Sequence, residues 1–274
     1  MTQKLSFAQL DVFTAVPYKG NPLALVHSAD ALTDAQMAAF ANWTNLSETA
    51  FLLQPTDSKA DYRVRIFTPT EELPFAGHPT LGACHAWLAA GGRPKGAEIV
   101  QQCEIGLIRI RHQNGRLAFA APPTSPEEID EATRAQIAAS LRVSPAAILA
   151  TQRVTKSPGF VAALFTSREE LLALKPDFAA MGHLKIGAVA PTPGHDADFE
   201  VRGFVPGIGE DPVTGSLNAG LARWLIGTGR APSRYTAAQG TAMGRAGRIY
   251  LEQDGADVWV GGDCVTCITG DVVI

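Results

Sequence analysis

A glutamate stands at the point where a polar turn meets an apolar strand. Glu48 lies within residues 45–53, NLSETAFLL, in which the polar residues end and an apolar run begins at once. A carboxylate at such a boundary is partly buried, and burial raises its pKa toward the range in which a general base can both take and return a proton. An exposed loop carboxylate or a helix cap fits the same spacing equally well. Glu48 is therefore a candidate proton carrier with a structural alternative.

Two clusters of glycine, proline and polar residues, 74–80 (PFAGHPT) and 210–216 (EDPVTGS), each precede an apolar stretch of helical character. The first N–H groups of a helix have no partner within the helix and lie at the positive end of its dipole. A helix start can therefore bind a carboxylate without Lys or Arg. Gly77 and Gly215 would let a ligand approach the backbone closely. Two such starts facing each other would form an anion-binding cleft.

The same clusters have a structural interpretation, which can hold together with the binding role. Pro79 suits the first turn of a helix, where its missing N–H is not needed. Thr214 or Ser216 suits the cap of the second helix. These residues alone do not separate the two interpretations.

His78 is the histidine with the most suggestive setting. A lone histidine is more often structural than catalytic, but His78 lies beside Gly77 and in a loop that mirrors the loop of Asp211, so we favour a functional role. We expect His85, inside an apolar helix, to be a hydrogen-bonded core residue. No comparable setting surrounds the remaining histidines, which are His27, His112, His183 and His195.

The elements that must position these residues repeat along the chain. Residues 80–90 and 216–226 are apolar or small almost all the way round, so each predicts a helix enclosed by sheet. Arg65, Phe67 and Pro69 match Arg202, Phe204 and Pro206, and Trp87-Leu88 matches Trp224-Leu225, both at an offset of 137 (202 − 65 and 224 − 87). This indicates an internal duplication. We expect an α+β fold of two pseudo-equivalent halves, each a curled, mostly antiparallel sheet around one central helix.

Strand-like alternation at 62–67, 105–111 and 248–251, with the hairpin dipeptides Asn114-Gly115 and Asp254-Gly255, supports antiparallel pairing. Further helices are expected at about 33–42, with Thr33 as cap, 127–140 and 167–174. The proline-rich residues 121–126 mark the junction, so we predict halves at 1–120 and 121–274. The last strand, about 265–274, either stays with the second half or returns to complete the first.

The composition argues against nucleic acid and membranes as partners. Twenty-three Lys and Arg against 27 Asp and Glu give a formal charge of −4, and no basic run suits nucleic acid. No stretch of about 18 apolar residues predicts a membrane span, and we expect a cytoplasmic protein. Of the four cysteines, Cys264 and Cys267 form a CxxC, but positions three apart on a strand face opposite sides, so we expect buried thiols rather than a metal or redox pair.

The ordered motifs resemble the signatures of the PhzF-like phenazine biosynthesis family, and they cover nearly the whole chain from about residue 10. The matching motifs are Asp11-Val-Phe-Thr-Ala, Gly20-Asn21-Pro22-Leu-Ala, Asn45-Leu-Ser-Glu-Thr49, Gly77-His78-Pro-Thr80, Glu210-Asp211-Pro-Val-Thr-Gly215-Ser216, and Gln239-Gly240 with Gly244-Arg245. Each motif is weak by itself. Six in order are specific to the family, although not to one reaction within it.

The resemblance implies a diaminopimelate epimerase-like fold, usually assembled as a homodimer, and an isomerase that uses no metal or organic cofactor. In the phenazine enzyme the matching glutamate, Glu48 in this chain, moves a proton of trans-2,3-dihydro-3-hydroxyanthranilate from one ring carbon to another. By the same match, His78 and Asp211 position the substrate and assist the proton. The substrate-contacting residues would be Asn21, Gly77, Gly215 and Ser216.

Three readings of function stay open from the sequence. The first is the PhzF-like proton shift on a small cyclic carboxylic acid. The second is isomerisation or epimerisation of another small carboxylate or amino acid. The epimerase branch of this fold uses one cysteine in each half, and since the corresponding loops of this chain carry no cysteine, two-thiol racemisation is disfavoured. The third is a protein that binds a small molecule in the same cleft without turnover.

Overall fold

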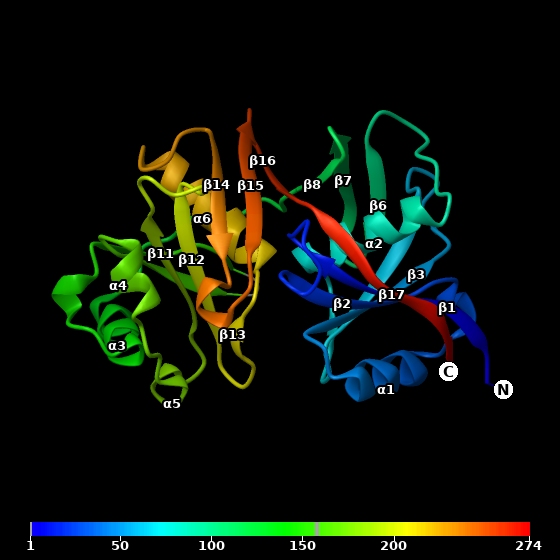
Figure 1. The fold of residues 1–274 in the computed structure, drawn as a ribbon, viewed down its shortest axis with the longest axis horizontal. Helices are drawn as coiled ribbons and strands as arrows, with labels where there is room; N and C mark the ends of the chain where they lie inside the picture. Colours follow the sequence, from blue (N-terminus) through cyan, green and yellow to red (C-terminus); the bar gives the residue numbers. More distant parts are fainter. Residues whose placement is uncertain (1, 157–158) are drawn as a thin grey trace. The chain divides into compact units, whose positions relative to one another are not determined.

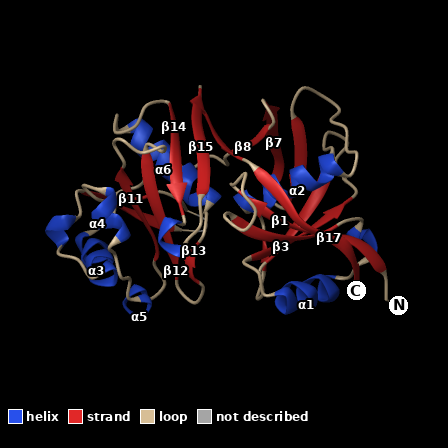
Figure 2. Cartoon of the chain, viewed as in Figure 1, coloured by secondary structure: helices blue, strands red, loops and turns tan. Residues whose placement is uncertain are grey.

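A computed structural model describes residues 2–156 and 159–274, coloured along the chain in Figure 1 and by secondary structure in Figure 2. The chain divides into two compact units. Unit 1 comprises Met1–Ala120 and Gly261–Ile274, and unit 2 comprises Ala121–Val260. Unit 2 therefore ends at Val260 rather than at the last residue. The reason is that the final strand, β17 (Cys264–Val273), pairs antiparallel with the first strand, β1 (Lys4–Val12), along its length.

Unit 1 is a curled sheet around one helix. Strand β1 also pairs antiparallel with β2, while the pairs β2 with β3 and β4 with β6 are parallel and the remaining pairs are antiparallel. Its other elements, in chain order, are β2 (Asn21–Val26), η1 (Ala29–Ala31), α1 (Asp34–Thr44), β3 (Glu48–Leu53), β4 (Tyr62–Phe67), β5 (Glu72–Leu73), α2 (Gly77–Ala89), β6 (Ile99–Cys103), β7 (Gly106–Gln113) and β8 (Arg116–Ala120).

Unit 2 repeats this order. The pairs β10 with β11 and β12 with β14 are parallel, in the places of the two parallel pairs of unit 1. Its elements are α3 (Glu131–Leu141), η2 (Pro145–Ala147), β9 (Ala150–Arg153), β10 (Phe160–Leu164), α4 (Arg168–Leu172), α5 (Phe178–Met181), β11 (Lys185–Pro191), β12 (Phe199–Val205), β13 (Gly209–Asp211), α6 (Gly215–Gly227), β14 (Arg234–Gln239), η3 (Thr241–Met243), β15 (Gly247–Asp254) and β16 (Asp257–Gly262).

The repeat holds at the level of strand register. Leu23 pairs with Glu48 in unit 1, and Phe160 pairs with Lys185 in unit 2, so both partners are displaced by the predicted 137 residues. The central helices are displaced by 138, since Gly215 follows Gly77 by 215 − 77 = 138. The expected match of Trp87 with Trp224 is therefore wrong by one residue, and Trp87 takes the helix position of Leu225. The extra residue lies in the β12–β13 hairpin, where the paired residues Gly203 and Asp211 are eight apart, whereas Ile66 and Leu73, paired between β4 and β5, are seven apart. The structure thus supports an internal duplication.

Helices α2 and α6 are enclosed, as their apolar sequences predict. A glycine at the same point of each helix allows the close approach of a strand. A Cβ added to Gly82 would lie 2.4 Å from Cδ2 of Leu23, and one added to Gly220 would lie 2.5 Å from the carbonyl oxygen of Val154. A side chain at Gly220 would therefore push the helix away from this backbone, and one at Gly82 would force the Leu23 side chain to move. Both helices begin earlier than expected, because Gly77, His78 and Pro79 form the first turn of α2 instead of a preceding loop.

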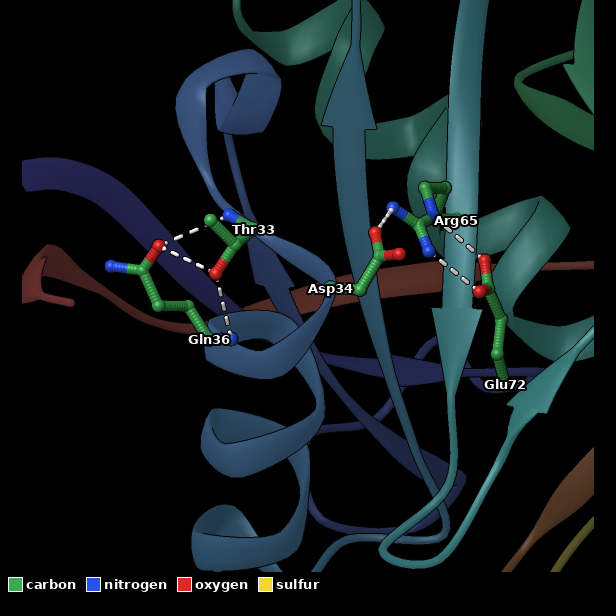
Figure 3. Close-up of polar contacts among 5 residues, drawn as sticks. All are labelled: Thr33, Asp34, Gln36, Arg65 and Glu72. Carbon is green, nitrogen blue, oxygen red and sulfur yellow. Dashed lines mark hydrogen bonds and ion pairs between the residues drawn. The ribbon is translucent and has the colours of Figure 1, made fainter.

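Local sequence signals account for the other predicted elements. Thr33 caps α1 in a capping box with Gln36, which appears at the left of Figure 3. Asn114 and Gly115, both at positive φ, form the two-residue turn between β7 and β8, as a type I′ hairpin requires. Helix α3 begins at Glu131 and not near 127, because the backbone of Glu127 instead exchanges hydrogen bonds with Arg153.

The cysteines do not form a pair. In the described residues all four thiols are free. Cys264 pairs with Val12 in the ladder between β17 and β1, whereas Cys267 lies at the shift in register between Ile268 and Thr266, so the two members of the CxxC motif have different surroundings. Within residues 2–156 and 159–274, no helix is both long and apolar enough to cross a membrane.

Candidate active site

The start of strand β3 fixes the position of Glu48. Helix α1 ends at Asn45, which adopts a left-handed conformation with φ of 54°. Three residues later the chain enters β3 with Glu48 as its first residue, and the next residue, Thr49, is fully buried. The Glu48 side chain itself is 17% exposed. The polar turn therefore leads directly into the core, and Glu48 stays at the boundary, as the sequence predicts.

His78 contacts Glu48. Nε2 of His78 lies 3.4 Å from Oε2 of Glu48, and the imidazole is almost fully buried in the first turn of α2. The two side chains come together because α2 and β3 both contact β2. Pro22 of β2 accepts a hydrogen bond from His78 through its backbone carbonyl, and the next residue, Leu23, pairs with Glu48. Three segments distant in the sequence thus meet at one point of unit 1.

Burial decides the charge of His78. Burial lowers the pKa of His78 to about 3, and the hydrogen bond to Pro22, which favours the protonated ring, is the smaller effect. The ring is therefore neutral at physiological pH. Nε2 has no hydrogen-bond partner, so the bond to Pro22 uses the Nδ1–H group. In that tautomer Nε2 carries a lone pair that faces the Glu48 carboxylate.

The start of α2 offers backbone donors next to this pair. The helix begins with Gly77, and the capping position, Ala76, has no side chain that could accept the first N–H groups. Asn21, the first residue of β2, is fully buried beside Pro22 and pairs with Val12. Four of the predicted site residues therefore lie in unit 1: Asn21, Glu48, Gly77 and His78.

Asp211 belongs to a second polar group, in unit 2. Asp211 ends β13, and its Oδ2 accepts a hydrogen bond of 2.6 Å from the hydroxyl of Thr214. Thr214 occupies the capping position of α6, but its side chain makes no capping hydrogen bond. The capping interpretation is therefore wrong for Thr214, because its hydroxyl oxygen accepts from Nε2 of Gln239 instead of a helix N–H, and its hydroxyl proton is donated to Asp211. Gly215 and Ser216 follow as the first two residues of α6, with their N–H groups at the positive end of the helix.

An arginine and a glutamate hold the segment that leads into each helix start. In unit 1, Nε and Nη2 of Arg65 donate to both carboxylate oxygens of Glu72 at 2.7 and 2.6 Å (Figure 3). In unit 2, Arg202 makes the same pair of bonds with Glu210 at 2.9 and 2.8 Å. Such bidentate pairs fix direction as well as distance. They hold β5 against β4 and β13 against β12, immediately before α2 and α6.

A hollow of about 560 Å³ lies elsewhere in unit 1, and its lining includes His85, His112 and Asp263 but neither Glu48 nor His78. His85 forms a 3.0 Å hydrogen bond with the Thr266 hydroxyl, as expected, but it is half-buried and not a core residue, because it lines this hollow. Its pKa is lowered by burial and, to a smaller extent, by His112. The size of this hollow does not make it the reactive site, since it contains no carboxylate paired with a buried imidazole.

The thiols are poorly suited to acid/base chemistry. Burial raises the pKa of Cys84 to about 12 and that of Cys103 to about 11, so both stay protonated at physiological pH. Burial raises the pKa of Cys264 and Cys267 as well. Among the described residues, no group of His, Cys, Asp and Glu side chains is arranged to hold a metal ion.

Sequence reasoning missed two polar partners. Thr214 was considered only as a cap, although its spacing of three residues from Asp211 permits a hydrogen bond across a turn. Gln239 entered only as part of a motif, and its contacts with the Asp211 segment come from a strand 25 residues farther along the chain than Thr214. That the two helix starts face each other across a cleft stays a prediction.

The chain has relatives among known proteins. Residues 10–270 match the family model of phenazine biosynthesis-like proteins, PhzC-PhzF. The chain is 33% identical over 294 aligned residues to antisense-enhancing sequence 1 of Schizosaccharomyces pombe, with 97% of each chain covered. It is 31% identical over 281 residues to the trans-2,3-dihydro-3-hydroxyanthranilate isomerase of Pseudomonas fluorescens, with 98% of this chain and 99% of that protein covered.

The fold has the same relatives. The crystal structure of a PhzF-family phenazine biosynthesis protein from Bacillus anthracis superposes with a TM-score of 0.85 at 22% identity, covering 99% of this chain and 100% of that one. This likeness confirms the predicted α+β fold. With the family match over nearly the whole chain and related proteins that are isomerases, the chain belongs to the phenazine biosynthesis-like (PhzF) family and is an isomerase.

Proposed function

We propose that this isomerase moves a proton between carbons of a small cyclic carboxylic acid, with Glu48 removing and returning the proton. One observation carries the proposal: the Glu48 carboxylate lies 3.4 Å from a buried, neutral imidazole at the start of a helix whose first N–H groups have no capping side chain. The first substrate to test is trans-2,3-dihydro-3-hydroxyanthranilate, the acid in the name of the Pseudomonas fluorescens relative.

The chemistry needs one group that takes a proton and gives it back. A carboxylate at the edge of the core suits both steps. The Nε2 lone pair of His78 gives the protonated form of Glu48 a hydrogen-bond acceptor, which stabilises the state in which Glu48 carries the substrate's proton. His78 does not keep the proton itself, because burial holds its pKa at about 3. His78 therefore acts as the hydrogen-bond acceptor that stabilises the protonated carboxyl group of Glu48.

Negative charge develops on the substrate as the proton leaves. Donors that are already in position stabilise such charge best, since no reorganisation is needed at the moment of reaction. We assign this role to the first N–H groups of α2 at Gly77 and of α6 at Gly215 and Ser216, which also bind the substrate carboxylate. Asn21 supplies a further polar contact from β2, and Asp211 supplies the second acidic group.

Deuterium uptake from D₂O tests the proposal. Wild-type protein should place solvent deuterium on a ring carbon of trans-2,3-dihydro-3-hydroxyanthranilate, followed by NMR. Glu48→Gln should reduce uptake about 10³-fold, the effect of losing a general base, while calorimetry finds substrate binding within about fivefold of wild type. Glu72→Gln is the matched control, because it alters a glutamate of the same unit that pairs with Arg65 and lies outside the proposed site. It should lower the melting temperature and leave uptake within about twofold.

Each of the other possible results would favour a different function or role. Uptake on another small cyclic or amino carboxylic acid, but not on the dihydroanthranilate, would keep Glu48 as the proton carrier and replace the substrate. Tight binding with no uptake on any acid of such a panel would favour a protein that binds without turnover. Equal loss of uptake and of thermal stability in Glu48→Gln would mean that Glu48 is structural.

A further inference from the structure

Gln239 lies at the centre of the polar group in unit 2. It is the last residue of β14, and its side chain is fully buried. Its amide makes four hydrogen bonds, which use both N–H groups and both lone pairs. Nε2 donates to the Asp211 carbonyl (3.1 Å) and to the Thr214 hydroxyl (2.9 Å), and Oε1 accepts from the Thr214 N–H (3.1 Å) and from Nδ2 of Asn218 (2.8 Å).

Two backbone groups fix the orientation of this amide. The Asp211 carbonyl can only accept, and the Thr214 N–H can only donate, so a flipped Gln239 would face an acceptor with its oxygen and a donor with its nitrogen. Nε2 is therefore the donor in its contact with the Thr214 hydroxyl. The hydroxyl has a single proton, which is left for the 2.6 Å bond to Oδ2 of Asp211. Gln239 thus sets the direction in which Thr214 donates.

Close packing leaves this arrangement little freedom. A Cβ added to Gly203, on the neighbouring strand β12, would lie 2.8 Å from the Thr214 hydroxyl oxygen and 3.3 Å from Nε2 of Gln239. Gly240, which follows Gln239, has φ of +90°, and a Cβ there would lie 2.7 Å from the carbonyl oxygen of Pro212. Glycine is required at both positions because the backbone itself forms the wall around the network.

Unit 1 also contains a buried glutamine, but its hydrogen bonds do not lead to a candidate acid. Gln101 of β6 donates from Nε2 to the Thr80 hydroxyl in the first turn of α2 and accepts from the Tyr62 hydroxyl, both at 3.0 Å. The Thr80 hydroxyl in turn donates to the carbonyl of Ala76. Gln101 therefore supports a helix start, as Gln239 does, but none of these bonds reaches Glu48.

We propose that Gln239 is a positioning residue for Asp211, acting through the hydroxyl of Thr214 to hold the carboxylate in one direction and in its ionised form. The consequence for the reaction rests on the proposed function, in which Asp211 is the second acidic group. The structural part does not, because it concerns only the contacts within unit 2.

Carboxyl ¹³C NMR tests the proposal without substrate. In protein labelled at the aspartate side chains, the Asp211 signal is assigned with Asp211→Asn. Gln239→Met should move the titration midpoint of Asp211 to higher pH by about one unit, the size expected when a carboxylate loses a hydrogen bond. Thr214→Val should cause a similar shift. The double variant should shift no farther than Thr214→Val alone, because both changes remove the same hydrogen bond.

Two controls separate positioning from general destabilisation. Gln101→Met removes a buried amide of unit 1 and should lower the melting temperature while leaving the Asp211 midpoint in place. Thr214→Ser keeps the hydroxyl and should restore the wild-type midpoint. If Gln239→Met does not fold, Gln239→Asn retains an amide that is one methylene too short to reach Thr214, and it should show the same shift.

An unchanged Asp211 midpoint in a folded Gln239 variant would overturn the proposal, as would additive shifts in the double variant. Activity gives a separate result. If the function proposed above is correct, Gln239→Met should lower kcat about tenfold with KM within about twofold, a split that binding loss alone would not give. The NMR result and the activity result can differ. If Gln239→Met shifts the Asp211 midpoint but the wild-type protein exchanges no proton on any acid, then Gln239 positions Asp211 and the proposed function is wrong.

Discussion

The two units of this chain share a scaffold but carry different reactive side chains at matching points. In unit 1, Glu48 is the first residue of β3. In unit 2 the matching strand is β11, and its first residue is Lys185. The short strand before the central helix ends with Leu73 in unit 1, but with Asp211 in unit 2. Each unit thus has one candidate acid, at a position where the other unit has none.

The residues that repeat are those that hold the fold. Arg65 stacks on Phe67 and pairs with Glu72, as Arg202 stacks on Phe204 and pairs with its own glutamate, Glu210. The glycines inside the two central helices repeat as well. Each copy needs these contacts in order to fold, whereas one reaction needs each acid only once. A comparison of the two units therefore separates the residues that stabilise the fold, which occur in both, from the candidate reactive residues, which occur in one.

The shared arginine gives the largest expected difference in stability. Arg202 is 6% exposed and also donates to the carbonyls at the end of α4, Leu171, Leu172 and Leu174, whereas the second partner of Arg65 is the exposed carboxylate of Asp34. Arg202→Met leaves the Glu210 carboxylate, which is only 14% exposed, without its partner and should cost about 3–5 kcal/mol. Arg65→Met should cost about 1–2 kcal/mol, because water can reach its partners. Urea unfolding measures both, and equal costs would contradict the contrast.

Exchanging the residues at the end of the short strands tests the difference in chemistry. Asp211→Leu installs the residue that unit 1 carries there, and it should reduce deuterium uptake about 10²-fold, as the loss of a positioned acid does. The reciprocal variant, Leu73→Asp, should leave uptake within about threefold. If the reciprocal change lowers uptake as much as Asp211→Leu does, then the two strand ends are functionally alike and the proposed asymmetry is wrong.

Much of this organisation could be predicted from local sequence, and the exceptions have physical causes. The enclosed helices and the Asn114-Gly115 turn follow from composition and from positive φ, which are local properties. The sequence predicts that α2 begins three residues too late, at residue 80, since glycine and proline usually break helices. In a first turn, however, neither the missing N–H of Pro79 nor the freedom of Gly77 is harmful.

The site itself was less accessible to local reasoning. Glu48 and His78 are 30 residues apart, and they come together only because β3 pairs with β2 and α2 packs on both strands. Spacing alone left Glu48 equally able to be a loop carboxylate, and the family resemblance, not the periodicity, selected it. The hydrogen bond between Thr214 and Asp211 required the strand that carries Gln239 to be in place.

His78 predicts a pH dependence that unit 2 lacks, since Ser216 is at the matching helix position. The pKa of His78 is about 3 in the folded protein and about 6.5 when unfolded. Between these values the unfolded chain binds one proton more, so folding stability falls as the pH falls below 6.5, by about 1.4 kcal/mol per pH unit. Urea unfolding from pH 6 to 4 should therefore be less pH-dependent in His78→Gln than in wild type. Parallel curves would mean that the buried ring is protonated in the folded state.

The smallest effect separates two threonines that both occupy capping positions. Thr33 accepts the Gln36 N–H at 3.3 Å in a capping box (Figure 3), whereas Thr214 makes no capping bond and donates to Asp211. Thr33→Ala should lower the free energy of unfolding by about 1 kcal/mol, the usual cost of a lost cap, and leave deuterium uptake unchanged. Thr214→Val should instead reduce uptake, since it removes the donor to Asp211. A loss of uptake in Thr33→Ala, or none in Thr214→Val, would mean that position in the helix, rather than the bond each hydroxyl makes, decides what a threonine does in this fold.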